Sequence, residues 1–190
     1  KPKSYAIATL LAQFELITQL QYHSTMNPIE ILAYTSKLIS IPSVSGDEGK
    51  VAQFLFDDFK SRGWNPEKLN VSDGRFNVFV TFGKPEILLT THIDVVPAPS
   101  QLFSPRLDGE TLYGRGACDA KGIVATMVAT AEKLKAEGST NFALLFVVGE
   151  ELDGIGAKTA SVQLQGRGIK YIINGEPTEG KVMVAHKGVF

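Results

Sequence analysis

The chain has 190 residues, of which 44% are hydrophobic, so it is long and apolar enough for one domain with its own core. Its 19 basic residues nearly cancel its 20 acidic residues, which argues against a nucleic-acid or membrane partner and favours a small-molecule substrate. The single cysteine, Cys118, excludes an internal disulfide, and we expect a cytoplasmic protein.

The first segment, residues 1–25, carries apolar residues spaced as on one face of an amphipathic helix. The run is too short to cross a bilayer, which takes about 20 residues, and no signal-peptide cleavage site follows it. We interpret residues 1–25 as an N-terminal extension or linker. Residues 26–190 are then the folded part of the chain.

Two amphipathic helices are expected after this segment. Residues 27–30 supply an N-cap asparagine, a proline at the first helical position and a glutamate at the third, which predicts a helix to about Ser40. Ser45 and Glu48 repeat the spacing of a capping box. Gly63 stands where a left-handed C-terminal residue is needed, so a second helix is predicted between them.

Strands and one buried helix are expected in the rest of the chain. Residues 76–82 alternate apolar with polar side chains and 87–89 form a further apolar run, which predicts two strands. Residues 123–134 are apolar on almost every side and precede a glycine, as in a helix buried against a sheet. The unalternating runs at 142–148 and 171–173 are typical of strands covered on both faces. We therefore predict an α/β fold, a three-layer sandwich with a mostly parallel sheet and helices on both faces.

Metal-capable side chains follow the predicted strands or lie in the glycine-rich turn before the buried helix. They are His92, Asp94, Asp119, Glu150, Glu151 and Glu176. Taken one at a time, such residues are usually ordinary surface groups. Because ligands of open α/β sheets bind at the carboxyl ends of the strands, we expect these side chains to meet at one edge. An imidazole with several carboxylates suits zinc or a similar divalent ion.

Other site types fit the sequence poorly. A dinucleotide-binding domain would need a third glycine after Gly114 and Gly116, but Asp119 stands there and its carboxylate would repel a pyrophosphate. A serine hydrolase would need a Gly-x-Ser-x-Gly elbow, which the sequence lacks. Cys118 as a nucleophile would need a base that the sequence does not identify, so we interpret it as a small residue beside the metal-binding turn.

Four segments, residues 88–97, 113–122, 149–151 and 175–178, resemble the four signatures of the M20 metallopeptidase family. The resemblance implies a zinc-exopeptidase-like catalytic domain, of which residues 26–190 are the N-terminal part. It also implies that the lid and dimerisation domain, a final histidine ligand and the C-terminal part of the catalytic domain are absent. We interpret the chain as a fragment of a protein that forms a homodimer.

The same resemblance implies a site for two Zn²⁺ ions, with Co²⁺ as a possible substitute. His92 and Glu176 would hold one ion, Glu151 would hold the other, and Asp119 would bridge both. The peptide bond between Asp119 and Ala120 is expected to be cis, since members of the family commonly have a cis bond after the bridging aspartate.

Asp94 and Glu150 are the implied catalytic residues. Asp94 would orient the imidazole of His92, and Glu150 would take a proton from the attacking water and return it to the leaving amine. The implied reaction is metal-dependent hydrolysis of the amide bond of an N-acyl amino acid. Residues 184–188 resemble acetylornithine deacetylases, which favours N-acetylornithine deacetylation in arginine biosynthesis.

Several alternatives within and beyond the family stay open. They are a succinyl-diaminopimelate desuccinylase, a hydrolase of carrier-linked lysine or ornithine, a carboxypeptidase, and a truncated relative that binds metal without turnover. The choice among them depends on the acyl and side-chain pockets, which the resemblance places partly in the absent half of the protein.

Overall fold

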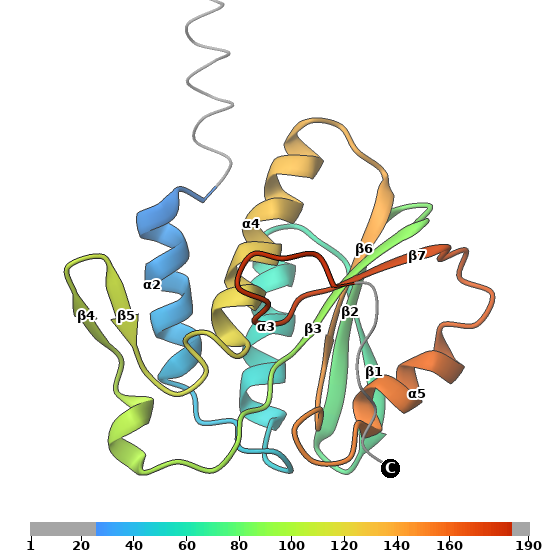
Figure 1. Cartoon of the computed structure of the whole chain (residues 1–190). Coiled ribbons are helices and arrows are strands. Elements are labelled where there is room, and N and C mark those ends of the chain that lie inside the picture. Colours follow the sequence, from blue (N-terminus) through green and yellow to red (C-terminus); the bar gives the residue numbers. More distant parts are fainter. Residues whose placement is uncertain (1–25, 184–190) are drawn as a thin grey trace, which may run out of the picture.

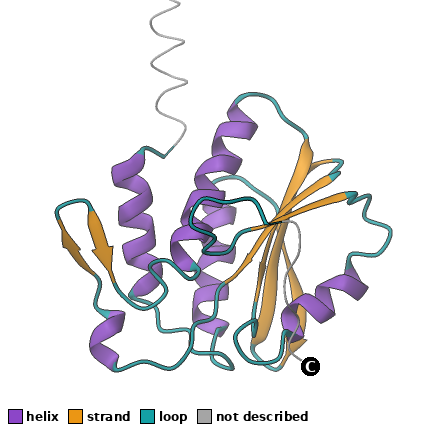
Figure 2. Cartoon of the chain, viewed as in Figure 1, coloured by secondary structure: helices purple, strands orange, loops and turns teal. Residues whose placement is uncertain are grey.

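The computed structural model describes residues 26–183. In this part of the chain a five-stranded sheet has helices on both of its faces (Figure 1, Figure 2). In spatial order the strands are β1 (Pro66–Ser72), β2 (Arg75–Gly83), β6 (Asn141–Val147), β3 (Ile87–His92) and β7 (Tyr171–Asn174). The predictions for residues 1–25 and for residues 184–188 lie outside the described residues.

The sheet is mixed, and one strand runs against the others. β3 pairs in parallel with β6 and β7, whereas β2 pairs antiparallel with β6 and β1. Four of the five strands therefore point the same way, and β2 is the exception. The expected α/β fold is confirmed. β1, whose first half alternates poorly between apolar and polar residues, was not predicted from the sequence.

Three helices lie on one side of the sheet, two of them packed directly on it, and one helix covers the other face (Figure 1). α3 (Gly49–Ser61) and α4 (Lys121–Ala136) pack on the first face, and α2 (Pro28–Ile39) packs on α4. α5 (Ile155–Gln163) covers the second face. Apolar side chains of β2 and β6 enter both cores, so these central strands hold the layers together.

α2 begins as its sequence predicts. The side chain of Asn27 accepts hydrogen bonds from the backbone N–H groups of Ile29 and Glu30, and the carboxylate of Glu30 accepts one from the N–H of Asn27. This reciprocal pair is a capping box, which satisfies N–H groups that have no partner inside the helix.

The capping box predicted for the second helix is wrong. Glu48 stands at the N-cap of α3 with no side-chain cap, and Ser45 lies outside the helix. Both side chains have stronger partners elsewhere: Ser45 donates to the carboxylate of Asp94, and buried Glu48 forms an ion pair with Arg75. Gly63, with a φ of 69°, ends the helix in the left-handed conformation expected for it.

The run at 171–173 is a strand, but the prediction that it is covered on both faces is wrong. Within the described residues β7 is an edge strand, and Tyr171, Ile172 and Ile173 are 65%, 65% and 55% exposed. β6 pairs on both sides and is buried from Phe142 onward, as predicted. An unbroken apolar run therefore predicted both strands correctly, but it did not distinguish the central strand, β6, from the edge strand, β7.

The segment between β3 and α4 forms an excursion outside the sheet. It contains a short 3₁₀ helix, η1 (Ser100–Phe103), and a hairpin of β4 (Arg106–Asp108) and β5 (Thr111–Tyr113). The glycine-rich turn after β5 then leads into α4 (Figure 2). None of the helices described here is long and apolar enough to cross a membrane.

Candidate metal centre

The parallel strands bring the predicted ligands to one edge of the sheet. His92 is the last residue of β3, Glu150 and Glu151 follow β6, and Glu176 follows β7. Since these three strands run in parallel, their carboxyl ends lie at the same edge, where open α/β sheets bind ligands. Asp119 reaches the same place from the turn that precedes α4.

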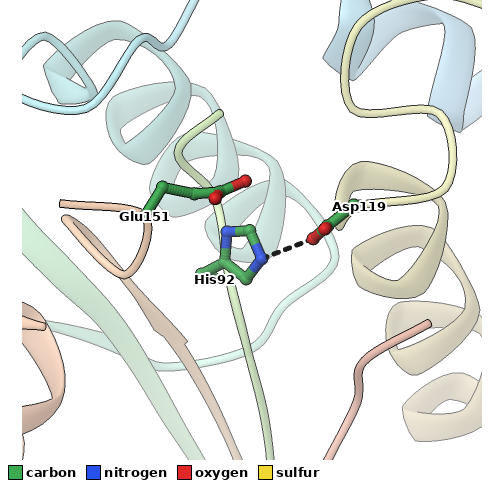
Figure 3. A group of neighbouring side chains, drawn as sticks. All are labelled: His92, Asp119 and Glu151. Atoms are coloured by element: carbon green, nitrogen blue, oxygen red, sulfur yellow. Dashed lines mark hydrogen bonds and ion pairs between the residues drawn. The ribbon is translucent and has the colours of Figure 1, made fainter. Parts of the chain in front are cut away.

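His92 lies at the centre of this group. Its Nε2 atom is 2.8 Å from Oδ1 of Asp119 and 3.8 Å from Oε2 of Glu176. Ligand atoms of His92, Asp119 and Glu151 all lie within 4.8 Å of one another, and Figure 3 shows both carboxylates beside the imidazole ring. The structure thus places four carboxylate or imidazole groups where one or two cations could bind between them.

The other nitrogen of His92 faces Asp94. The Nδ1 atom is 3.0 Å from the backbone oxygen of Asp94 and 3.4 Å from its carboxylate Oδ1. The backbone oxygen is an acceptor, so Nδ1 carries a proton and donates it there, with the carboxylate of Asp94 close beside it. Nε2 is then the nitrogen that faces the carboxylates of Asp119 and Glu176, and it would bind a metal ion after losing its proton.

Asp94 also holds the loop that follows β6, which the sequence did not reveal. Its Oδ1 accepts the backbone N–H of Glu150 at 3.0 Å, and its Oδ2 accepts that of Glu151 at 3.1 Å. The hydroxyl of Ser45 donates to Oδ2 at 2.6 Å. Burial alone would raise the pKa of Asp94, but the hydrogen bonds from His92, Ser45 and the two backbone groups lower it. Asp94 is therefore an anion at neutral pH.

The charges at the site favour a bound cation. Burial raises the pKa of Glu151, and repulsion from the carboxylate of Asp119 raises it further. Burial also raises the pKa of Glu176, and repulsion from Glu150 and Asp119 adds to this effect. Burial would lower the pKa of His92, but hydrogen bonds to Asp94 and Asp119 outweigh it and raise the pKa to about 9. Oxygen and imidazole donors crowded in this way fit a divalent ion such as zinc.

The turn that carries Asp119 is anchored from behind by Lys121. The peptide bond between Asp119 and Ala120 is cis, as expected. Lys121, which is 1% exposed, donates from Nζ to the backbone oxygens of Leu38 at 2.9 Å and Ile41 at 2.7 Å. Burial lowers the pKa of this lysine to about 8. Sequence reasoning missed this role, because a lysine at a helix start is normally read as a surface residue.

A cavity of about 540 Å³ lies between α5 and the sheet and reaches the candidate metal ligands. His92, Glu150 and Glu176 form part of its lining. Its other walls are largely apolar and come from β3, β6, β7, α5 and the segment just after α5, and they include Leu145, Leu164 and Ile172. The candidate centre is therefore in contact with open space next to the exposed edge strand.

Comparison with known proteins gives matches that cover most of the chain. Residues 88–186 match the model of the peptidase family M20/M25/M40. A probable carboxypeptidase of Aspergillus clavatus is 38% identical over 178 residues, which cover 86% of this chain and 43% of the relative. A peptidase M20 domain-containing protein of Schizosaccharomyces pombe is 37% identical over 183 residues, covering 90% of this chain and 45% of the relative. The chain thus spans less than half the length of these relatives.

Solved structures share the fold at lower identity. Human carnosine dipeptidase 1 superposes with a TM-score of 0.67 at 17% identity, over 78% of this chain and 38% of that chain. A dipeptidase of Saccharomyces cerevisiae gives a TM-score of 0.66 at 20% identity, over 77% of this chain and 38% of that chain. At these identities the similarity concerns the fold, and it agrees with the mixed α/β sheet described above.

Proposed function

The chain belongs to the peptidase family M20/M25/M40, and on this premise we propose that the whole protein hydrolyses a linear amide bond with two bound divalent ions. The observation that carries the proposal is the position of His92, whose Nε2 is 2.8 Å from Asp119 and 3.8 Å from Glu176 at the carboxyl edge of the sheet. The activity is proposed for the whole protein, because the chain covers 43% of the first relative.

We assign the metal ligands as follows. His92, Asp119 and Glu176 would hold one ion, and Asp119 and Glu151 would contribute to the second. Zinc is the proposed ion, with cobalt as a substitute, since both accept imidazole and carboxylate ligands in tetrahedral sites. A divalent ion bound there supplies Lewis acidity toward an amide carbonyl and makes water more acidic.

The residues around the ions perform the remaining steps. The backbone oxygen of Asp94 accepts the Nδ1–H of His92, which orients the ring so that Nε2 faces the metal ligands. Glu150, whose backbone is held by Asp94, takes a proton from the attacking water and passes it to the leaving amine. One carboxylate acts as base and then as acid, so its position relative to the water must persist through both steps.

For the substrate we propose an N-acyl amino acid whose acyl group is a peptide, so that the enzyme is a carboxypeptidase. The names of the fungal relatives support this choice, since the first is described as a probable carboxypeptidase. N-acetylornithine deacetylation is the second candidate, and it is favoured by residues 184–188 alone. Both substrates present the same bond, an amide whose nitrogen belongs to an amino acid with a free carboxylate.

The test uses the whole protein loaded with zinc or cobalt. Release of the C-terminal amino acid from an N-blocked dipeptide is compared with release of ornithine from N-acetylornithine, with and without a chelator. We expect chelator-sensitive hydrolysis of the dipeptide to be the faster reaction. Faster hydrolysis of N-acetylornithine would support the second candidate, and binding of metal without hydrolysis of either substrate would support a non-catalytic relative.

A further inference from the structure

We propose that Ser45 is a positioning residue of the metal centre, which it stabilises through the carboxylate of Asp94. The proposal rests on the proposed function, because it concerns the same site. Its central observation is the hydrogen bond of 2.6 Å from the Ser45 hydroxyl to Oδ2 of Asp94, between residues 49 positions apart in the sequence. Asp94 is fully buried, so its acceptor atoms depend on donors from the protein.

The backbone around Ser45 is fixed to the chain that follows β3. The N–H of Ser45 donates to the backbone oxygen of Val95 at 3.2 Å, and the N–H of Val95 donates to that of Ser43 at 3.0 Å. Val44 and Val95 form an isolated parallel bridge. The hydroxyl of Ser43 donates to the backbone oxygen of Ile93 at 2.8 Å. Residues 43–45 therefore form a short strand-like clamp beside the turn that contains Asp94.

A buried ion pair holds the other side of the same loop. The carboxylate of Glu48 is fully buried and accepts the N–H of Gly46 at 2.9 Å. It also accepts two hydrogen bonds from Arg75 of β2, from Nε at 2.7 Å and from Nη2 at 2.8 Å. The loop is thus fixed on both sides of Ser45, so its hydroxyl is held in place before any metal binds.

Asp94 transmits the position of Ser45 to three functional residues. Its Oδ1 accepts the N–H of Glu150 and faces Nδ1 of His92, while its Oδ2 is shared by Ser45 and the N–H of Glu151. Without the Ser45 hydroxyl, Oδ2 keeps only the N–H of Glu151 as a donor, and the carboxylate can rotate about its Cβ–Cγ bond. Such a rotation would weaken the 3.4 Å contact with Nδ1 of His92 and the hydrogen bonds that hold the Glu150–Glu151 backbone, so it would affect metal binding and proton transfer at once.

The experiment compares three variants of the whole protein with the wild type: Ser45→Ala, Ser45→Thr and Ser43→Ala. Ser43→Ala is the matched control, because it removes a buried hydroxyl from the same clamp without touching Asp94. For each variant we would measure zinc affinity by chelator competition, the visible absorption spectrum with cobalt, and kcat and KM separately. Folding is checked by thermal denaturation.

For Ser45→Ala we expect a ~10-fold loss in zinc affinity or in kcat, with little change in KM and an altered cobalt spectrum. Losses of this size are typical when a group that hydrogen-bonds to a metal ligand or its support is removed. Ser45→Thr keeps the hydroxyl and should restore most of the loss, while Ser43→Ala should lower the denaturation temperature but keep the wild-type spectrum. The proposal is overturned if Ser45→Ala has the zinc affinity and the cobalt spectrum of the wild type. It is also overturned if Ser43→Ala changes these two properties as much as Ser45→Ala does, or if Ser45→Thr is as impaired as Ser45→Ala.

Failure of the proposed function would look different. If the wild-type protein binds neither zinc nor cobalt, the proposed metal centre is wrong, whatever the results for the variants. If the wild-type protein binds metal but hydrolyses neither substrate, the proposed reaction is wrong. The zinc affinity and the cobalt spectrum of the variants still test the positioning role of Ser45.

Discussion

At the scale of single residues, Asp94 shows what sequence reasoning can and cannot reach. Its place two residues after His92, together with the family resemblance, predicted a contact with the imidazole, and the structure has Nδ1 of His92 at 3.4 Å from Oδ1. The hydrogen bonds from Ser45 and from the backbone of Glu150 and Glu151 join segments 49, 56 and 57 residues apart. Such contacts follow from tertiary packing, and no local spacing indicates them.

The pKa of His92 gives a prediction about metal binding and pH. In the metal-free protein this pKa is raised to about 9, so at pH 7 the imidazole carries a proton that an incoming ion must displace from Nε2. Apparent zinc affinity should therefore rise about 10-fold per pH unit and level off as the pH passes the pKa of His92. Calorimetry at pH 7 in buffers of different ionisation enthalpy should show about one proton released with the first ion.

His92→Ala is the control for this measurement, since it removes the titrating group. Any zinc that this variant still binds should no longer release that proton. Binding to the wild type without proton release at pH 7 would contradict the prediction.

The adjacent residues Glu150 and Glu151 should respond differently to the same substitution. Glu150→Gln keeps the volume of the side chain but cannot accept a proton, so the whole enzyme should keep its metal and lose ~100- to 10,000-fold in turnover. We expect the upper end, because one residue serves as base and acid. Glu151→Gln should instead lose one of the two ions.

Metal content and hydrolysis are measured side by side for both variants. A Glu150→Gln enzyme that remains active would defeat the proposed role, and so would one that is inactive only because its metal is lost. Equal metal loss in both variants would contradict the assignment of Glu150 to proton transfer and Glu151 to metal binding.

At the scale of helices and strands, local signals predicted beginnings and ends where no distant partner competed. The capping box of α2 formed because Asn27 and Glu30 have each other as partners. The same spacing at the start of α3 failed, because Asp94 and Arg75 bind Ser45 and Glu48. Both interactions involve charged groups, which form stronger hydrogen bonds than a neutral cap.

Lys121 connects two elements, and its removal should destabilise both. Its ammonium group caps the C-terminal end of α2 through the backbone oxygens of Leu38 and Ile41. Lys121→Met fills similar space but leaves these buried acceptors without their donor, so we expect a loss of about 2–4 kcal/mol in the free energy of unfolding. Urea denaturation of the metal-free chain measures this loss.

Lys135→Met is the matched control, because Lys135 lies exposed in the last turn of the same helix, α4. It should change the free energy of unfolding by less than about 1 kcal/mol. Equal effects of the two substitutions would show that the contacts of Lys121 contribute no more than a surface charge.

At the scale of the whole molecule, the α/β class followed from the apolar runs and the buried helix, but the surroundings of β7 did not. Periodicity reports whether a side chain is apolar, not whether a neighbouring strand or helix covers it. In the described part of the chain β7 pairs with β3 and exposes Tyr171, Ile172 and Ile173. The ligand cluster was predictable because it depends on strand ends. The substrate was not, since metal ligands and a proton-transferring carboxylate do not select between a peptide and an acetylated amino acid.

The last prediction concerns the metal capacity of the 190-residue chain. His92 is the one histidine among residues 26–183, and in the proposed assignment it forms one three-ligand site with Asp119 and Glu176. In the same assignment a second ion would have Glu151 and the shared Asp119, whose ligand atoms lie within 4.8 Å of each other, and half of a tetrahedral zinc shell would be left to water. Calorimetry with zinc should therefore show one tight event per chain, abolished by His92→Ala. Glu176→Gln should weaken that event, whereas Glu151→Gln should spare it. Two equally tight sites that survive His92→Ala would refute the ligand assignment.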